Sequence, residues 1–428
     1  MSKPNDLYTY PLYVNMQFFF CGVPFRLDTY SGCQHGCRYC FARASENFNY
    51  ERRDSEKGLI RKTDPHLVNH MLVKSVDSSK TYNDINVEFL RRRVPIHWGG
   101  MSDPFQPCEK KWRVSKQVLG HLNWYQYPVV ISTKGALAGD DEYIAMLKDG
   151  NNAMQVSLIS DDDKITSGIE PGAPNATARL KIMEKLAHAG LWVACRIQPV
   201  IPASPVEEGL ERLITKLAGA GVKHIVVEGL KIPMQLDKDW RACLNEVCGG
   251  KVEQEYKACE AALDGQEIIL PAWRKWQYLE VCLETAHKYG ITVGAADNNM
   301  RDFGDVKACC GIDNLPGFEN YWQLQSARVS EIARQKGICM ASDLDNEWSG
   351  TCEFKFQSST ISPKVDGVAV SYPMRYYWDQ VWALNDDGRS PSHLVNLDQK
   401  IVDGKVGYVF NDKREMLKRS HVKQHTMF

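Results

Sequence analysis

The sequence has almost no net charge, because 52 Lys and Arg stand against 53 Asp and Glu and leave −1. A chain without an overall field is not drawn as a whole to nucleic acid or to an anionic membrane, so such contacts require local patches. No apolar stretch approaches the ~20 residues that a membrane span needs. The N-terminus lacks the charged-then-apolar pattern of a signal peptide. We therefore expect a soluble, cytoplasmic protein with no membrane partner.

The sequence also lacks the pattern of a disulfide scaffold. Fourteen cysteines are spread unevenly over 428 residues, and several lie in apolar runs. Disulfide-rich domains are short and secreted, so a reducing compartment fits this chain better. No internal repeat or low-complexity tract is visible. With 43% hydrophobic and 25% charged residues, the composition is that of a globular protein with one large domain or two smaller ones.

Three cysteines stand close together, in the run Ser-Gly-Cys-Gln-His-Gly-Cys-Arg-Tyr-Cys-Phe. Cys33, Cys37 and Cys40 have the spacing Cys-x3-Cys-x2-Cys. Three thiolates on one loop can hold three irons of a 4Fe–4S cluster and leave the fourth iron open to another ligand. A structural zinc site, which needs a fourth ligand such as His35, is an alternative reading, and buried cysteines without a ligand are another. The spacing favours the cluster.

Strand-like and helix-like segments alternate from residue 24 to about 297, which predicts an α/β fold with a parallel sheet or barrel. The cysteine loop follows the first strand, at the edge where such folds gather their functional groups. The expected strands are 25–30, 94–99, 128–133, 153–160, 191–199, 223–228 and 291–297. The expected helices are 66–76, 140–147, 175–190, 206–220 and 271–289.

The domain organisation follows from where this rhythm begins and ends. We expect an N-terminal segment (1–23), a barrel (24–300) and a C-terminal substrate or auxiliary region (301–428). Within the barrel, polar residues about 42–93 and helical residues about 231–268 interrupt the alternation and are expected to be insertions.

The cysteine loop resembles that of the radical S-adenosylmethionine (SAM) superfamily, and further segments are similar to the spore photoproduct lyase group. Together they cover roughly residues 24–230, in the order of that group. After the cysteines, the Glu-Pro-Gly-Ala-Pro run is the most discriminating segment. The segments are Gly32–Cys40, Gly99–Pro107, Ile131–Lys134, Gln155–Leu158, Glu170–Pro174 with Arg179 and Leu180, and Arg196–Pro202.

The resemblance implies a partial (β/α)6 TIM-type barrel that binds a 4Fe–4S cluster and SAM. In that superfamily, electron transfer from the cluster breaks the sulfonium bond, and a 5′-deoxyadenosyl radical abstracts hydrogen from a substrate. A reductant such as flavodoxin or ferredoxin is the implied partner. The chain would then be a lyase, an isomerase or a base-modifying enzyme.

Side chains at the ends of the expected strands suit contacts with SAM. Glycines let the backbone approach a ligand, a lysine can pair with its carboxylate, and apolar rings pack against adenine. Taken singly, these residues have ordinary structural readings, since a Gly-Gly pair is often only a turn. We expect cofactor contacts from Tyr39, Phe41, Gly99, Gly100, Ser102, Asp103, Lys134, Ser157 and Arg196.

The resemblance departs at one position. Spore photoproduct lyase returns a hydrogen atom from a cysteine just before its Ser-Asp pair, and that position here is Gly100. Glycine has no S–H bond, so reversal of a thymine dimer by this route is not expected. Cys108, Cys310 and Asp297 are candidates for a catalytic role. For Cys108, a buried structural thiol is the more common reading.

Adjacent cysteines occur in the C-terminal region. Cys309 and Cys310, together with Cys339 and Cys352, have the ligand types for a second iron–sulfur cluster. Their spacing matches no known pattern, and adjacent residues bind one metal awkwardly. Small buried residues are therefore the alternative.

Aromatic and basic residues point to the substrate class. The segment 372–382 is rich in Tyr and Trp, Arg91–Arg93 form a basic run, and the tail carries several Lys and Arg from Lys413 to Lys423. Stacking rings beside cations suit a nucleic acid, and a base in a duplex would have to flip out. An ordinary core for the aromatic residues and a solvated helix end for the tail are the alternative readings. By analogy with the spore photoproduct lyase group, the resemblance implies a thymine or modified base as substrate. A peptide, protein or small metabolite is the alternative substrate, and a non-catalytic iron–sulfur sensor or scaffold is the alternative of another class.

Overall fold

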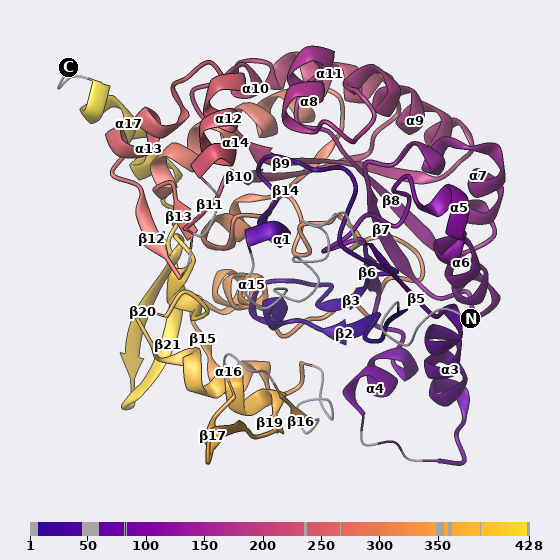
Figure 1. The fold of residues 1–428 in the computed structure, drawn as a ribbon. Helices are drawn as coiled ribbons and strands as arrows, with labels where there is room; N and C mark the ends of the chain where they lie inside the picture. The colour runs from indigo at the N-terminus through magenta and orange to yellow at the C-terminus, as the bar shows by residue number, and fades with distance from the viewer. Residues whose placement is uncertain are drawn as a thin grey trace.

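The computed structural model describes residues 7–44, 60–80, 82, 84–234, 238–265, 267–347, 355–357, 362–385 and 387–425. Its centre is an eight-stranded sheet whose strands lie side by side in the order in which they occur along the chain, while strands of smaller sheets occur between some of them (Figure 1). Every pair is parallel except the edge pair β2–β3. In spatial order the strands are β14 (Thr292–Ala295), β10 (His224–Gly229), β9 (Trp192–Val200), β8 (Asn152–Ser157), β7 (Val129–Thr133), β6 (Ile96–Trp98), β3 (Phe25–Leu27) and β2 (Leu12–Val14).

Helices connect the strands and form an arc outside them (Figure 1). The sheet does not close on itself, because β14 and β2 are its edges. The predicted partial barrel is confirmed, and each of the seven predicted strands and five predicted helical segments overlaps an observed element, with ends that differ by a few residues. The helices of this part are α1 (Phe41–Ala44), α3 (Pro65–Val76), α4 (Ile85–Arg91), α5 (Glu109–Trp112), α6 (Val114–Trp124), α7 (Asp141–Lys148), α8 (Asp163–Ile169), α9 (Ala176–His188), α10 (Pro205–Glu208), α11 (Leu210–Gly219) and α14 (Ala272–His287).

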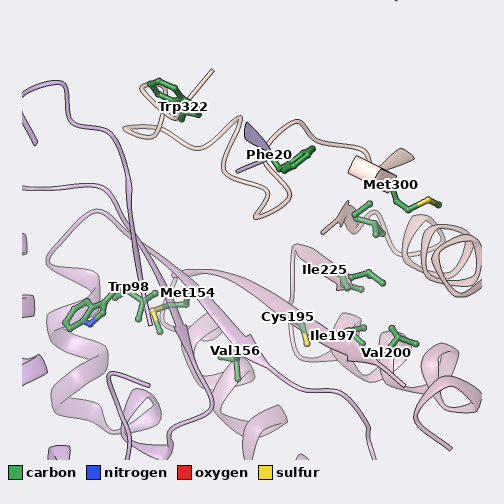
Figure 2. Packing of buried hydrophobic residues seen from close by; sticks show 14 of the residues in the cluster. Phe20, Trp98, Met154, Val156, Cys195, Ile197, Val200, Ile225, Met300 and Trp322 are labelled. Carbon is green, nitrogen blue, oxygen red and sulfur yellow. The ribbon is translucent and has the colours of Figure 1, made fainter. Parts of the chain in front are cut away.

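Successive side chains along each strand alternate between the outer face of the sheet, which the helices cover, and its inner face. In β9, Cys195 and Ile197 are fully buried in the main core, where Figure 2 shows them with other strand residues. Because successive side chains point to opposite faces, Arg196 faces the inner side of the sheet.

A helix cap predicted from the sequence marks where one of the connecting helices begins. Asn175 caps α9 by accepting a hydrogen bond from the Ala178 N–H.

A loop from the C-terminal half closes the N-terminal end of the inner space. Val130 and Ala153, early in β7 and β8, pack there in a second apolar cluster. The inner space, which we call the lumen, is thus sealed at one end and bordered at the other by the loops that follow the strands. The remaining members of that cluster are Cys21, Val23, Ala308, Ile312, Phe318 and Tyr321.

The N-terminal segment and the C-terminal region share the core of the barrel. Phe18 and Phe19 pack against Trp322 and Trp378, and the main core runs from Leu12 to Leu417. The boundaries predicted at 23 and 300 therefore do not interrupt the core. The C-terminal elements are η5 (Asn298–Phe303), α15 (Ser326–Lys336), β15 (Cys339–Met340), η6 (Ala341–Leu344), β16 (Lys355–Phe356), β17 (Lys364–Val365), β18 (Val368–Ala369), β19 (Tyr372–Pro373), α16 (Met374–Trp382), η7 (Pro391–His393), β20 (Leu397–Val402), β21 (Lys405–Phe410) and α17 (Arg414–His425).

Both predicted insertions contain regular structure. The second is more than helical, since three short strands form an antiparallel sheet beside its helices. None of the described helices is long and apolar enough to cross a membrane. The elements not yet given are β1 (Leu7–Tyr8), η2 (Met16–Phe19), β4 (Tyr30–Ser31), β5 (Arg61–Thr63), η4 (Ala136–Gly139), β11 (Ile232–Pro233), α12 (Lys238–Val247), α13 (Val252–Ala258), β12 (Ala262–Asp264) and β13 (Glu267–Ile269).

Candidate cluster and cofactor site

The cysteine loop lies between β4 and α1, at the edge of the barrel where the parallel strands end. Cys37 is buried, and Cys33 and Cys40 are half-buried. The loop is tied to the neighbouring segment by a hydrogen bond from the Arg38 N–H to the Ile169 carbonyl at 2.8 Å. The loop thus occupies the predicted position on the barrel.

The three thiols are electrostatic neighbours of one another. Burial, followed by the charge of Asp103, raises the pKa of Cys33 to about 12, and Cys40 adds to this effect. Burial also raises the pKa of Cys37, on which the charges of both other cysteines act. Close thiols raise one another's pKa because two adjacent anions repel, so a cation is the partner that would favour their thiolate forms.

The donor set suits a 4Fe–4S cluster. Within the residues that the structure describes, no three His, Cys, Asp or Glu side chains are arranged around a single ion. A cluster does not require such convergence, since each thiolate binds a different iron. The three thiols of this loop therefore fit three irons of one cluster.

Asp103 joins the loop to the ends of β6 and β7. One carboxylate oxygen accepts from the Phe105 N–H at 2.8 Å and the Thr133 hydroxyl at 2.7 Å. The other accepts from the Lys134 N–H at 2.6 Å and lies 3.0 Å from Nε2 of His35, inside the cysteine loop. Burial alone would raise the pKa of Asp103, but His35 and these donors outweigh it and lower the pKa. Asp103, expected to contact SAM, thus binds the loop and the strand ends together.

Ser102 also has a partner within the chain. Its hydroxyl donates to the Tyr30 carbonyl at 2.7 Å, and its N–H donates to the buried Asp28 carboxylate at 3.1 Å. Tyr30 precedes the cysteine loop, so this hydroxyl fixes the start of the loop. The expectation that Ser102 binds SAM gains no support from these contacts.

Lys134 lies beside the cluster loop within a buried network of charges. Its Nζ is 3.9 Å from a Glu170 oxygen and 5.7 Å from the centre of the Tyr39 ring. Glu170, which directly follows α8, also binds Arg179 of α9 and the Tyr39 hydroxyl, and the Tyr39 contact holds this segment against the cysteine loop. Burial lowers the pKa of Lys134, but the charges of Cys37 and Glu170 outweigh it and raise the pKa. The ammonium group therefore stays charged next to Cys37.

Four other residues expected to contact the cofactor are Phe41, Ser157, Gly99 and Gly100, and their surroundings differ. Phe41 is 52% exposed at the start of α1, and the carbonyl of Ser157 accepts a hydrogen bond from Arg179 at 2.9 Å. Gly99 has φ +93°, and a Cβ on it would lie 2.3 Å from the Ser132 carbonyl oxygen, so its glycine is required by the fold. Gly100 has room, because a Cβ there would meet only the Arg26 side chain, at 3.6 Å.

Arg196 lies inside the lumen rather than at its mouth. Its Nη1 donates to the Ser132 hydroxyl at 2.8 Å and to Nε2 of His97 at 3.0 Å, and its Nε donates to Gln198 at 2.6 Å. Gln198 in turn donates to Glu228 at 3.0 Å. These bonds connect β6, β7, β9 and β10 across the inner face of the sheet.

The candidates for a catalytic role lie in different surroundings. Cys108 precedes α5, where burial, then Glu109 and Cys33, raise the pKa of its thiol to about 12. Asp297 is buried, with its carboxylate 3.0 Å from the Lys275 ammonium and accepting from Tyr278 at 2.8 Å. Cys108 is thus near the cluster loop, and Asp297 is held in a structural ion pair.

The described cysteines of the expected second cluster, Cys309, Cys310 and Cys339, do not share one set of neighbours. Cys339 lies in β15, where the charged neighbours of its thiol are Asp343, Lys336 and Arg328. Cys309 and Cys310 interact instead with each other and with Cys21. Cys352 lies outside the described residues.

Three residues of the lumen were not anticipated: Cys21, Arg26 and Arg301. A signal for Arg26 exists in the sequence, since it is a charged residue in the apolar strand Phe25–Leu27, as His97 is in Ile96–Trp98. The two residues are paired in the register of β3 and β6. Polar residues that alternate with apolar ones in a barrel strand point inward. Cys21 lies in an irregular segment and Arg301 in the 3-10 helix η5, where the alternation of a strand does not mark inward-facing residues.

Comparisons with known proteins give relatives without an assigned activity. An uncharacterized protein of Mycobacterium tuberculosis is 28% identical over 217 residues, which are 49% of this chain and 60% of the relative. An uncharacterized protein of Acidianus two-tailed virus is 30% identical over 212 residues, 46% of this chain and 64% of the relative. The chain thus spans about 60% of the length of the mycobacterial relative. No family model matches the chain.

Solved structures similar to the chain include spore photoproduct lyase, with a TM-score of 0.49 and 14% identity over 65% of this chain and 77% of the other. SuiB of Streptococcus suis has a TM-score of 0.36 and 14% identity over 55% of this chain and 48% of the other. The first name is that of the group that the cysteine loop resembles. At these identities and TM-scores, neither likeness carries a conclusion about the activity, the substrate or the site residues of this chain.

Proposed function

We propose that the chain is a radical SAM enzyme whose cysteine loop holds a 4Fe–4S cluster through Cys33, Cys37 and Cys40. When bound, the cluster and SAM supply a 5′-deoxyadenosyl radical, which abstracts hydrogen from a substrate. The observation that carries the proposal is the placement of three neighbouring thiols at the strand-end edge of a partial parallel barrel, beside a charged lysine. The reductant we expect is a flavodoxin or ferredoxin.

The residues around the loop have different roles in the proposed binding of SAM. Lys134 Nζ lies farther from Glu170 than a hydrogen bond reaches, so its N–H donors are directed to a carboxylate such as that of SAM. Asp103 positions both Lys134 and the loop, because it binds the backbone of one and His35 in the other. The ring of Tyr39, a residue of the loop, borders a hollow formed with Leu230 and Ile232. An apolar face there suits adenine.

For the substrate we propose a thymine or modified base in nucleic acid, and this rests on the resemblance of the sequence segments. The aromatic segment adds nothing to it, since Tyr377, Trp378 and Trp382 are buried in the core. The described basic residues are also engaged: Arg93 donates to the Tyr125 carbonyl, and Lys413 pairs with Asp398. A peptide, protein or small metabolite is the second substrate class.

Anaerobic reconstitution tests the chemistry. We expect about four irons per chain and release of 5′-deoxyadenosine when SAM and a strong reductant are added. Cys37→Ala should reduce this release at least about 100-fold, since one iron loses its thiolate. Cys243→Ala, in α12, is the matched control and should retain it. Bound zinc in place of iron, or a cluster that never yields 5′-deoxyadenosine, would refute the proposal and favour a structural site or a sensor.

Salt dependence tests the nucleic-acid substrate separately. Binding of a thymine-containing oligonucleotide should weaken linearly in log[salt], because phosphate contacts release counterions. Turnover in deuterated water, followed by mass spectrometry of nucleosides, should then locate the exchanged hydrogen. Absent or salt-independent binding would move the assignment to a peptide or a metabolite and leave the cluster chemistry untouched.

A further inference from the structure

Three arginines from separate elements converge in the lumen below the cluster loop. Arg26 comes from β3, Arg196 from β9 and Arg301 from η5. Burial, then the positive charge of Arg26, lowers the pKa of Arg196. Burial also lowers the pKa of Arg301, but Cys309 and Cys21 outweigh it and raise the pKa. Two cysteines link the three groups, since Arg26 donates to the sulfur of Cys21 at 3.5 Å, Cys21 and Cys309 both act on Arg301, and Cys309 also acts on Arg196.

Two of these guanidinium groups have some contacts, such as that of Arg301 with the side chain of Cys309, but each also has buried donors without a hydrogen-bond partner among the described residues. Arg301 is 7% exposed, and its Nε and Nη1 have no partner within the described part of the chain. Its Nη2 is 3.5 Å from the Asn298 side-chain oxygen, which is a weak contact. Arg26 donates from Nη2 to the sulfur of Cys21 at 3.5 Å, and among the described residues its buried Nε has no partner. Buried donors without acceptors are costly, so an acceptor is expected beside them.

The carboxylates near these arginines already serve other cations and donors. Glu228 acts on both Arg196 and Arg301, but it is paired with Lys231 at 2.6 Å and accepts from Gln198. Asp28 acts on Arg26, but its carboxylate accepts from the N–H groups of Met101 and Ser102 and from Tyr13. The lumen therefore holds an excess of positive charge, with planar donors that match an oxyanion.

We propose that Arg26, Arg196 and Arg301 form a subsite for an oxyanion, a phosphate or a carboxylate, of the substrate. Because Arg301 is more than nine-tenths buried, the anion must be a terminal group or part of a small molecule. Gly100 lies next to the Arg26 side chain of this subsite, two residues before Ser102, which binds the start of the cluster loop. Because glycine has no Cβ, Gly100 leaves the Arg26 side chain uncovered. The assignment of the anion to the substrate rests on the proposed function, but binding of the anion does not.

Equilibrium binding of anions to the full-length chain tests the subsite without any turnover. Inorganic phosphate and acetate are titrated by calorimetry and by thermal unfolding, with SAM as a third arm. We expect one of the two anions to bind and to raise the melting temperature. Arg301→Gln should weaken that binding about 10-fold or more, since hydrogen bonds to a charged group are lost. Arg212→Gln, a surface arginine paired with Asp161, is the matched control and should bind as the parent does.

The arms of the experiment identify the source of the anion. Tighter binding of phosphate points to a terminal phosphate of the substrate, and tighter binding of acetate points to a carboxylate. Arg26→Gln provides a second test should Arg301→Gln not fold, because Arg26 is half-buried and contributes an independent donor. Displacement of the anion by SAM, absence of binding of both anions, or an equal loss in Arg212→Gln would overturn the proposal. A failure of 5′-deoxyadenosine release would not affect these measurements and would refute only the radical chemistry.

Discussion

The charges at the cluster loop and those in the lumen are buried to a similar degree but are compensated differently. Near the loop, Glu170 lies between Arg179, Lys134 and the Tyr39 hydroxyl, so each cation has an anion. In the lumen, guanidinium donors of Arg301 have no acceptor within the described chain. Compensated buried charges fix a geometry, whereas uncompensated ones leave donors for a ligand. We infer that the contacts of Glu170 with Arg179 and Tyr39 are structural, whereas the unpaired donors of the lumen, like the ammonium group of Lys134, are available to a ligand.

The largest expected effect comes from breaking the compensated network. Arg179→Met should lower the free energy of unfolding by about 3–5 kcal/mol, because it leaves the buried Glu170 without its main partner. Urea denaturation of the purified chain measures this. Arg212→Met removes an exposed partner of Asp161 and should change the stability little. A small effect of Arg179→Met would mean that the loop network is as open as the lumen, and the comparison would fail.

Two adjacent glycines sharpen the contrast between filled and open space. Gly99→Ala should cost about 3 kcal/mol, since it puts a side chain at φ +93° and 2.3 Å from the Ser132 carbonyl oxygen. Gly100→Ala should be nearly neutral, because its Cβ would meet only the end of Arg26 in the lumen. Thermal unfolding of both variants gives the difference. Equal losses would show that the lumen beside Arg26 is as tightly packed as the strand end.

Most of the barrel was predictable from the sequence because its signals are local. Buried parallel strands are short apolar runs, and caps such as Asn175 mark where helices begin. The antiparallel edge strand β2 and the hairpin of β20 and β21 were not predicted. Their pairing depends on partners distant in the sequence or on turn residues such as Asp403 and Gly404, which were not interpreted.

The candidate site was predictable in position more than in role. The cysteine loop and Lys134 lie together as expected, since both follow strands whose ends meet at one edge. Asp103 and Ser102 lie there too, but their polar groups bind the chain itself. A sequence gives the type of a polar residue and not which partner satisfies it. Arg301 was missed for a different reason. It lies in the short 3-10 helix η5, where no alternation of polar and apolar residues marks a side chain that points inward.

Protonation of a buried histidine adds one more charge to the lumen. His224 in β10 bonds to the Thr292 hydroxyl and the Cys309 carbonyl, and burial lowers its pKa to about 4. An unfolded histidine has a pKa of about 6.5, so the unfolded state binds more protons between these values. Stability is therefore complete above about pH 6.5 and falls as the pH drops toward 4.

Urea denaturation at two pH values measures this contribution. We expect the chain to be less stable at pH 5 than at pH 7 by about 2 kcal/mol through His224 alone. His224→Gln should remove that share of the pH dependence, and His188→Gln, on the surface of α9, should retain it. An unchanged pH dependence in His224→Gln would mean that the lumen accepts an additional positive charge without cost.

The smallest expected effect is the most informative about the lumen. Arg301→Met, measured by urea denaturation in a buffer free of phosphate and carboxylate, should change the free energy of unfolding by less than about 1 kcal/mol or even raise it. The reason is that two buried donors of this guanidinium, Nε and Nη1, have no acceptor within the described chain, so the group gains little from hydrogen bonds and bears the cost of desolvation, which a methionine avoids. With an oxyanion present, the parent chain should become more stable than the variant. A loss comparable to that of Arg179→Met in the anion-free buffer would show that Arg301 is a structural residue, and both regions would then be built alike.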